Sequence, residues 1–148
     1  MLCQDPVDTP RRKIEFFVER AMSHSQHLEP GPDHPITISS NPNRVVVKVS
    51  GKTLVDTKRA LMLKESSYPE VFYVPREDAD MSLLERTDHH TYCPYKGDCS
   101  YYRVRADNGR AVNAVWTYET PYPAVSEIAG HLAFYPDRVD SIEEVPNA

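Results

Sequence analysis

The densest group of reactive side chains in the sequence lies in residues 87–102. Cysteine thiolates attack carbonyl carbons, carboxylates transfer protons, and a lysine ammonium stabilises developing negative charge. Pro94 and Gly97 put turns into this segment, and chemistry is common on irregular segments that a rigid scaffold holds. The segment therefore predicts a pocket with catalytic or binding groups. Its reactive residues are His89, His90, Cys93, Lys96, Asp98 and Cys99.

Cys93 is the candidate nucleophile, and Lys96 and Asp98 are its candidate catalytic partners. Lys96 together with His89 or His90 would hold the Cys93 thiol partly as the reactive thiolate. In the same cleft we expect Asp98 to act as acid or base and Lys96 to stabilise negative charge. The alternative is that Cys93, which precedes a proline, is a small buried residue that closes a turn.

Three basic residues are candidates for binding an anionic ligand: Arg59, Arg76 and Lys96. Gly97, next to Lys96, allows the close backbone approach that anion-binding loops need. Each basic residue has an alternative, which is a local ion pair with a neighbouring acid. Those acids are Glu77, Asp78 and Asp98.

Aromatic residues are candidates for the walls of the pocket. Tyr101, Trp116 and Tyr118 lie on two predicted strands, which the turn signal of residues 107–109 (Asp-Asn-Gly) would join. Alternate positions of a strand face the core, so the remaining ones are free to stack against a ligand ring. His89 is a further ligand-binding candidate. For Trp116, packing in the core is the competing interpretation.

A zinc site would have to use His89, His90, Cys93 and Cys99. Structural zinc sites usually pair cysteines with about two to four residues between them. Five residues separate Cys93 from Cys99, and no second pair follows. We therefore predict no metal and no cofactor. A disulfide between Cys93 and Cys99 fits such a loop, but it is disfavoured in a reducing compartment.

The bulk properties exclude several classes of protein. The 148 residues suffice for one domain with a core, and the net charge of -5 argues against a general nucleic-acid binder. No apolar run reaches the ~20 residues of a membrane helix, and no secretory pattern opens the chain. The count of 3 cysteines is odd and fits reduced thiols, so we expect a cytoplasmic protein.

An amphipathic helix is predicted near the N-terminus. Thr9 caps it and Pro10 occupies its first turn, and an apolar stripe follows at helical spacing. This stripe needs a partner, which is either the rest of the chain, another protein, or a second copy in a homodimer. The stripe consists of Ile14, Phe17, Val18 and Ala21.

Short strands dominate the rest of the chain. Alternating valines in residues 45–50 turn at Gly51 into residues 53–56, which predicts a hairpin. Helical spacing returns at Val125, Ile128, Ala129 and Leu132, and residues 134–139 resemble a last strand. Further strands are predicted at residues 60–63, 71–74, 100–105 and 111–118.

These elements predict a mainly β or α+β domain of antiparallel sheets, with an N-terminal amphipathic helix and a short C-terminal helix. We divide the chain into a helix and linker over residues 1–33, a β-rich domain over residues 34–142, and a frayed tail over residues 143–148.

Several short motifs follow one another along the chain: His34-Pro35-Ile36, Pro75-Arg76-Glu77-Asp78, Cys93-Pro94-Tyr95-Lys96-Gly97, Trp116-Thr117-Tyr118-Glu119, Glu127-Ile128-Ala129-Gly130-His131 and Phe134-Tyr135-Pro136-Asp137-Arg138-Val139. Together they resemble the bacterial and fungal "domain of unknown function 427" family, sometimes labelled nucleotidyltransferase-like. The resemblance covers about residues 35–140, and it implies a two-sheet, β-tent-like fold with a cleft between the sheets.

The resemblance implies no mechanism. The sequence has no glycine-rich phosphate loop and no clear pair of metal-binding carboxylates, so it gives little support to nucleotidyl transfer. The family usually carries a small residue where this chain has Cys99, so a metal site that uses Cys99 would be peculiar to this protein.

Two functions are therefore expected from the sequence. The first is a pocket protein for an unknown small polar or anionic molecule, which acts as an enzyme if the cysteine, lysine and aspartate of the cleft are catalytic. The alternative is a non-catalytic interaction module that assembles through the N-terminal helix. A structural zinc protein is a third, weaker interpretation.

Overall fold

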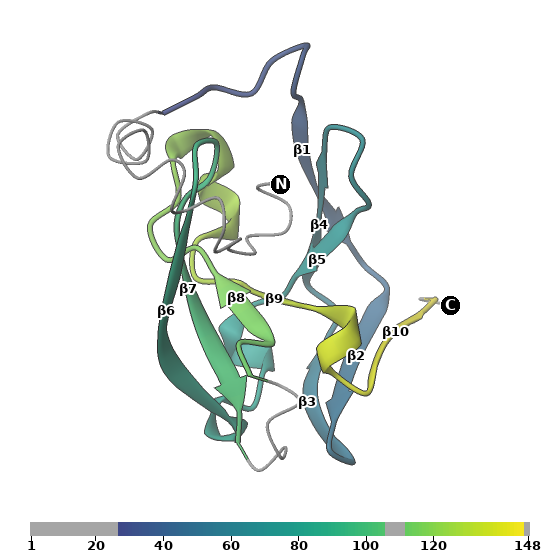
Figure 1. The fold of residues 1–148 in the computed structure, drawn as a ribbon. Helices are drawn as coiled ribbons and strands as arrows, with labels where there is room; N and C mark the ends of the chain where they lie inside the picture. Colours follow the sequence, from purple (N-terminus) through teal and green to yellow (C-terminus); the bar gives the residue numbers. More distant parts are fainter. Residues whose placement is uncertain (1–26, 106–111, 147–148) are drawn as a thin grey trace.

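The computed structural model describes residues 27–105 and 112–146 (Figure 1). Within these residues the chain is mainly β, with three antiparallel sheets and short 3-10 helices. The predicted N-terminal helix and the turn at residues 107–109 lie outside the described residues. In the described part, no helix has the length and apolar character needed to cross a membrane.

A four-stranded sheet forms one side of the molecule, on the left in Figure 1. Its two long strands form a hairpin whose turn contains Lys96, and its strand order is β6-β7-β8-β9. The strands are β6 (Leu84–Cys93), β7 (Gly97–Val104), β8 (Val115–Thr117) and β9 (Leu132–Phe134).

Two three-stranded sheets form the other side, on the right in Figure 1, in the orders β1-β4-β5 and β10-β2-β3. The first contains β1 (Ile36–Asn41), β4 (Ala60–Glu65) and β5 (Val71–Tyr73). The second contains β2 (Arg44–Val49), β3 (Lys52–Thr57) and β10 (Ser141–Val145). The 3-10 helices are η1 (Arg76–Asp78), η2 (Met81–Leu83), η3 (Pro123–Ile128) and η4 (Pro136–Arg138).

The predicted valine hairpin is confirmed as β2 and β3. Ser50 and Gly51 form its turn with φ of 52° and 76°, the left-handed geometry that two-residue hairpin turns require. In β2, Val45, Val47 and Val49 are at most 1% exposed, whereas Arg44 and Lys48 are exposed; Val46, between the first two, is also buried at 6%. Burying this face of the hairpin supplies part of the core.

The two sides meet where Val74, just after β5, pairs with Leu132 of β9. Their backbone N–H groups donate to each other's carbonyls at 2.9 and 2.8 Å. The buried residues form two groups, one mainly aliphatic, which includes Val74 and Leu132, and one rich in aromatic rings. The aromatic group contains Tyr73, Tyr101, Trp116, Tyr118 and Tyr135, together with Cys93 and Cys99.

The C-terminal part differs from its prediction. Val125 and Ile128 are buried in the 3-10 helix η3, but Leu132 belongs to strand β9. Gly130, with φ of 71°, reverses the chain between them, so the apolar stripe does not continue as an α-helix. The last strand expected at residues 134–139 is not formed: Phe134 ends β9, and η4 follows at Pro136–Arg138. The tail expected to fray instead contains β10, in which Glu143 and Glu144 pair with β2.

Candidate functional site

Lys96 lies in the turn between β6 and β7, and its backbone is held on both sides. Its N–H donates to the Cys93 carbonyl at 3.2 Å, and its own carbonyl accepts from the Tyr122 N–H at 3.1 Å. Gly97 follows with φ of 109°, a conformation that L side chains rarely adopt. This geometry directs the Lys96 side chain into the protein, where the residue is 1% exposed.

Glu65, the last residue of β4, is the partner of Lys96. Its Oε1 lies 2.6 Å from Nζ of Lys96, and the two side chains are 0% and 1% exposed. Burying charge is costly unless the charge is paired and hydrogen-bonded. The ion pair therefore compensates both charges and connects the β1-β4-β5 sheet to the β6–β7 turn.

His34 is the third member of this group. Its Nε2 lies 2.7 Å from Oε2 of Glu65, and its ring stacks on Tyr95 with 4.0 Å between centroids. The His34 side chain is 24% exposed, unlike the buried pair behind it. We call His34, Glu65 and Lys96 the buried triad, and its only part-exposed member is His34.

The segment before β1 holds His34 in place. The Leu28 N–H donates to the Pro94 carbonyl at 3.0 Å, and Gly31 and His34 exchange backbone hydrogen bonds. In Figure 1 this segment runs over one end of the molecule, from the β6–β7 hairpin to β1. The buried triad thus comes from three separate parts of the chain.

The surroundings favour neutral forms of buried groups. Burial lowers the pKa of Lys96, against the opposing attraction of the Glu65 carboxylate. Nζ also lies 5.6 Å from the centre of the Tyr118 ring, within the range of a cation–π contact. For acidic groups, burial acts in the opposite direction: it raises the pKa of Tyr118 and raises that of the Cys99 thiol to about 11.

The predicted catalytic residues do not all meet. Lys96 pairs with Glu65 rather than with Asp98, which is exposed on β7 opposite Tyr92. Cys93 is 1% exposed, and its sulfur accepts from the Lys96 backbone N–H at 3.3 Å. Because the sulfur is buried, nucleophilic chemistry at Cys93 would need a route of access.

The predicted aromatic residues are core residues by exposure. Tyr101, Trp116 and Tyr118 are 1%, 3% and 0% exposed, and Trp116 Nε1 donates to the Tyr73 hydroxyl at 3.1 Å. His89 is half-buried, with its ring 4.5 Å from that of Tyr101. Tyr118 is the one that contacts the buried triad, through the ammonium of Lys96.

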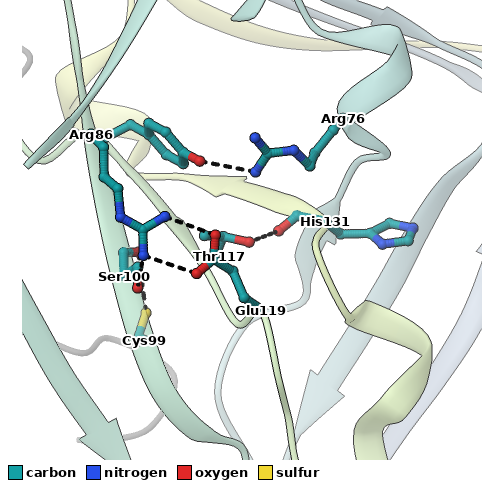
Figure 2. A network of polar contacts seen from close by, with 8 residues as sticks. Arg76, Arg86, Cys99, Ser100, Thr117, Glu119 and His131 are labelled. Atoms are coloured by element: carbon teal, nitrogen blue, oxygen red, sulfur yellow. Dashed lines mark hydrogen bonds and ion pairs between the residues drawn. The ribbon is translucent and has the colours of Figure 1, made fainter.

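The two predicted arginines are engaged elsewhere. Arg59 forms an ion pair with Asp78 at 3.1 Å, the alternative that the sequence left open, and Thr57 Oγ1 donates to the same carboxylate at 2.6 Å. Arg76 Nη1 donates to the Tyr102 hydroxyl at 2.9 Å (Figure 2). Neither arginine is hydrogen-bonded to the buried triad in the described residues.

Figure 2 also shows a second polar group that the sequence did not suggest. Arg86 of β6 donates to both carboxylate oxygens of Glu119 at 2.8 and 2.9 Å, and to Ser100 Oγ at 2.9 Å. This pairing lowers the pKa of Glu119. Both side chains are well exposed, at 46% and 39%, so the contact is a surface ion pair of modest strength.

Sequence reasoning missed His34 and Glu65 as site residues. Glu65 had a usable signal, because it follows Leu63 at strand spacing and both are buried on the same face of β4. A carboxylate at an inward strand position requires a cation, and Lys96 was already a candidate. Among the described residues, no group of three or more His, Cys, Asp or Glu side chains is arranged to hold a metal ion.

The family model described as "Domain of unknown function (DUF427)" matches residues 37–145. The chain therefore belongs to this family, as its motifs indicated. No curated protein matches the chain.

Proposed function

We propose that the protein binds a small polar or anionic molecule at the buried triad and that the triad transfers protons to or from it. The observation that carries this proposal is the buried Lys96–Glu65 ion pair, which is linked through one carboxylate to the part-exposed His34. Buried ionisable groups that converge in this way are frequent at functional sites.

Each member has a defined part in this proposal. Lys96 stabilises negative charge on the ligand or gives it a proton, since its ammonium is shielded from water. Glu65 accepts or returns the proton through Oε1, and His34 exchanges it with solvent from Oε2. Charge interactions are stronger in such a dry site than in water.

The meeting of the two sides at Val74 and Leu132 supports the β-tent-like arrangement expected for the family. Cys93 as nucleophile and the cytoplasmic location stay predictions. Assembly through the N-terminal helix also stays a prediction, because that segment lies outside the described residues.

A purely structural role for the ion pair is the competing explanation, and ligand binding separates the two. We would screen small carboxylates, phosphates and polar metabolite-like compounds by thermal shift and by changes in amide NMR spectra. The matched control is the double variant Glu65→Leu/Lys96→Met, because replacing both members of a buried pair by apolar residues of similar size is often neutral or stabilising.

We expect ligands that raise the melting temperature of the wild type and perturb amides around residues 34, 65 and 96, with no effect on the folded double variant. Ligands that stabilise both proteins equally would place binding elsewhere. If the screen finds no ligand for the wild type, and the double variant is more stable than the wild type, the pair has a purely structural role.

A further inference from the structure

The Lys96 amine has the surroundings of a nucleophile as well as those of a charge. An amine attacks carbon only in its neutral form, and desolvation is a common way to obtain that form. Lys96 is 1% exposed, and its burial lowers its pKa. Among the described residues, its ion-pair partner is a single carboxylate, Glu65, at 2.6 Å.

The released proton has a path to the surface. Oε1 of Glu65 faces Nζ of Lys96, while Oε2 of the same carboxylate faces Nε2 of His34 at 2.7 Å. His34 is 24% exposed, so protons can be exchanged with solvent without exposing the amine. Imine formation needs these properties, because protons leave and return several times during the reaction.

We propose that the ligand of the buried triad is a small aldehyde or ketone that condenses with Nζ of Lys96 to form an imine. This inference rests on the proposed function and names its substrate class. Lys96 would then be a catalytic residue, Glu65 its proton acceptor and donor, and His34 the link to solvent.

The reaction balances without an oxidant or a further reactant. Glu65 takes a proton from the ammonium, and the free amine pair forms a C–N bond as the C=O π pair moves to oxygen. Oxygen takes the proton back from Glu65, which then removes one from nitrogen. That proton leaves with the hydroxyl as water, and the nitrogen pair forms the iminium, whose positive charge faces the Glu65 carboxylate.

The burial of Lys96 also limits the size of the substrate. His34 and the half-buried Tyr95, which stack on each other, are the part-exposed residues next to the pair. In this proposal a carbonyl compound reaches Nζ past these two rings. We therefore expect glycolaldehyde, glyoxylate and pyruvate to react, and bulky aromatic aldehydes to react far more slowly.

The test is reductive trapping on the full chain, with each carbonyl compound and sodium cyanoborohydride at neutral pH and peptide mass spectrometry as the readout. The internal controls are the exposed Lys48 and Lys52. We expect Lys96 to be modified at least tenfold faster than either, and the preference to vanish in urea. Glu65→Gln keeps a neutral hydrogen-bond acceptor, and it should slow trapping at Lys96 at least tenfold.

Outcomes for this inference and for the proposed function are distinct. If ligands bind wild-type protein and require the triad, but Lys96 is trapped no faster than Lys48, the imine is excluded and the proposed function stands. If neither binding nor trapping occurs in wild-type protein, both are overturned. These outcomes are read from wild-type protein, so they can still be decided if the Glu65→Gln variant fails to fold.

Discussion

At the scale of single residues, the site rests on two charges that are removed from water together. Lys96 and Glu65 are each at most 1% exposed, and the charge of each is balanced by the opposite charge of the other. The desolvation cost of such a pair is large, and the attraction between its members offsets that cost only while both are present.

The single variant Lys96→Met leaves the Glu65 carboxylate buried beside His34 alone. We expect it to lower the free energy of unfolding by about 3–5 kcal/mol, whereas Glu65→Leu/Lys96→Met should recover most of the loss. Urea unfolding of the wild type and the variants measures this. Glu65→Leu is the second single variant. If the double variant lost as much free energy of unfolding as the two single variants added together, the pair would not be coupled.

Cys99 gives a prediction for alkaline pH. Its thiol is deeply buried, which raises its pKa from 9.0 to about 11. Because the folded pKa exceeds the unfolded one, the thiol contributes stability that is present below pH 9 and is lost as pH rises through 11. Over that range we expect the wild type to lose about 2 kcal/mol more than Cys99→Ala. Parallel pH profiles in urea unfolding would refute this.

At the scale of elements, two connections hold the buried triad: the β6–β7 turn and the segment before β1. The turn positions Lys96 through backbone contacts to Cys93 and Tyr122, and the segment positions His34 through contacts to the same turn. Neither connection is a regular strand or helix, but the turn joins β6 to β7 and the segment leads into β1.

Gly97→Ala tests the turn. A Cβ has room there, since its nearest neighbour would be the Thr120 carbonyl oxygen at 3.6 Å, but φ of 109° disfavours any L side chain. We expect a loss of about 1–3 kcal/mol and altered NMR signals for Lys96. Gly31→Ala is the matched control, because its Cβ would meet nothing within 4 Å and its φ is ordinary. Equal losses for both variants would rule out conformational strain.

Two truncations test the segment before β1. A chain that starts at residue 27 keeps the Leu28–Pro94 hydrogen bond and the pairing of Gly31 with His34, whereas one that starts at residue 34 loses both. We expect only the longer chain to keep the His34–Glu65 contact, read from the His34 ring signals by NMR. Identical ring signals in the two chains would show that the segment does not position His34.

The sequence predicted the elements whose pattern is local. The alternation of valines specified the β2–β3 hairpin, and the motif around Cys93 and Lys96 marked the turn that carries the site. The C-terminal stripe failed as a helix because Gly130 reverses the chain and Leu132 pairs in a sheet. Tertiary pairing overrides periodicity in so short a segment.

The partners of Lys96 could not be predicted in the same way. Glu65 and Lys96 are 31 residues apart, and His34 is another 31 residues before Glu65. Local spacing carries no information on contacts of this range. The neighbouring Asp98 was the nearest acid in sequence, but strand alternation places it on the exposed face of β7.

At the scale of the whole molecule, the buried triad lies where elements from both sides of the fold meet. Glu65 belongs to the β1-β4-β5 sheet, and Lys96 to the hairpin of the four-stranded sheet. A ligand bound there would touch both sides at once. The family match over residues 37–145 covers Glu65 and Lys96 but begins after His34.

A proton-transferring triad is tested most directly by the pKa of the Lys96 amine, measured in the folded wild type by NMR with lysine labelled at the carbon next to Nζ. We expect a value below the ordinary 10.5, because burial disfavours the charged amine, and a further change when a ligand binds. A Lys96 pKa at or above 10.5 that no ligand changes would contradict a proton-transferring triad.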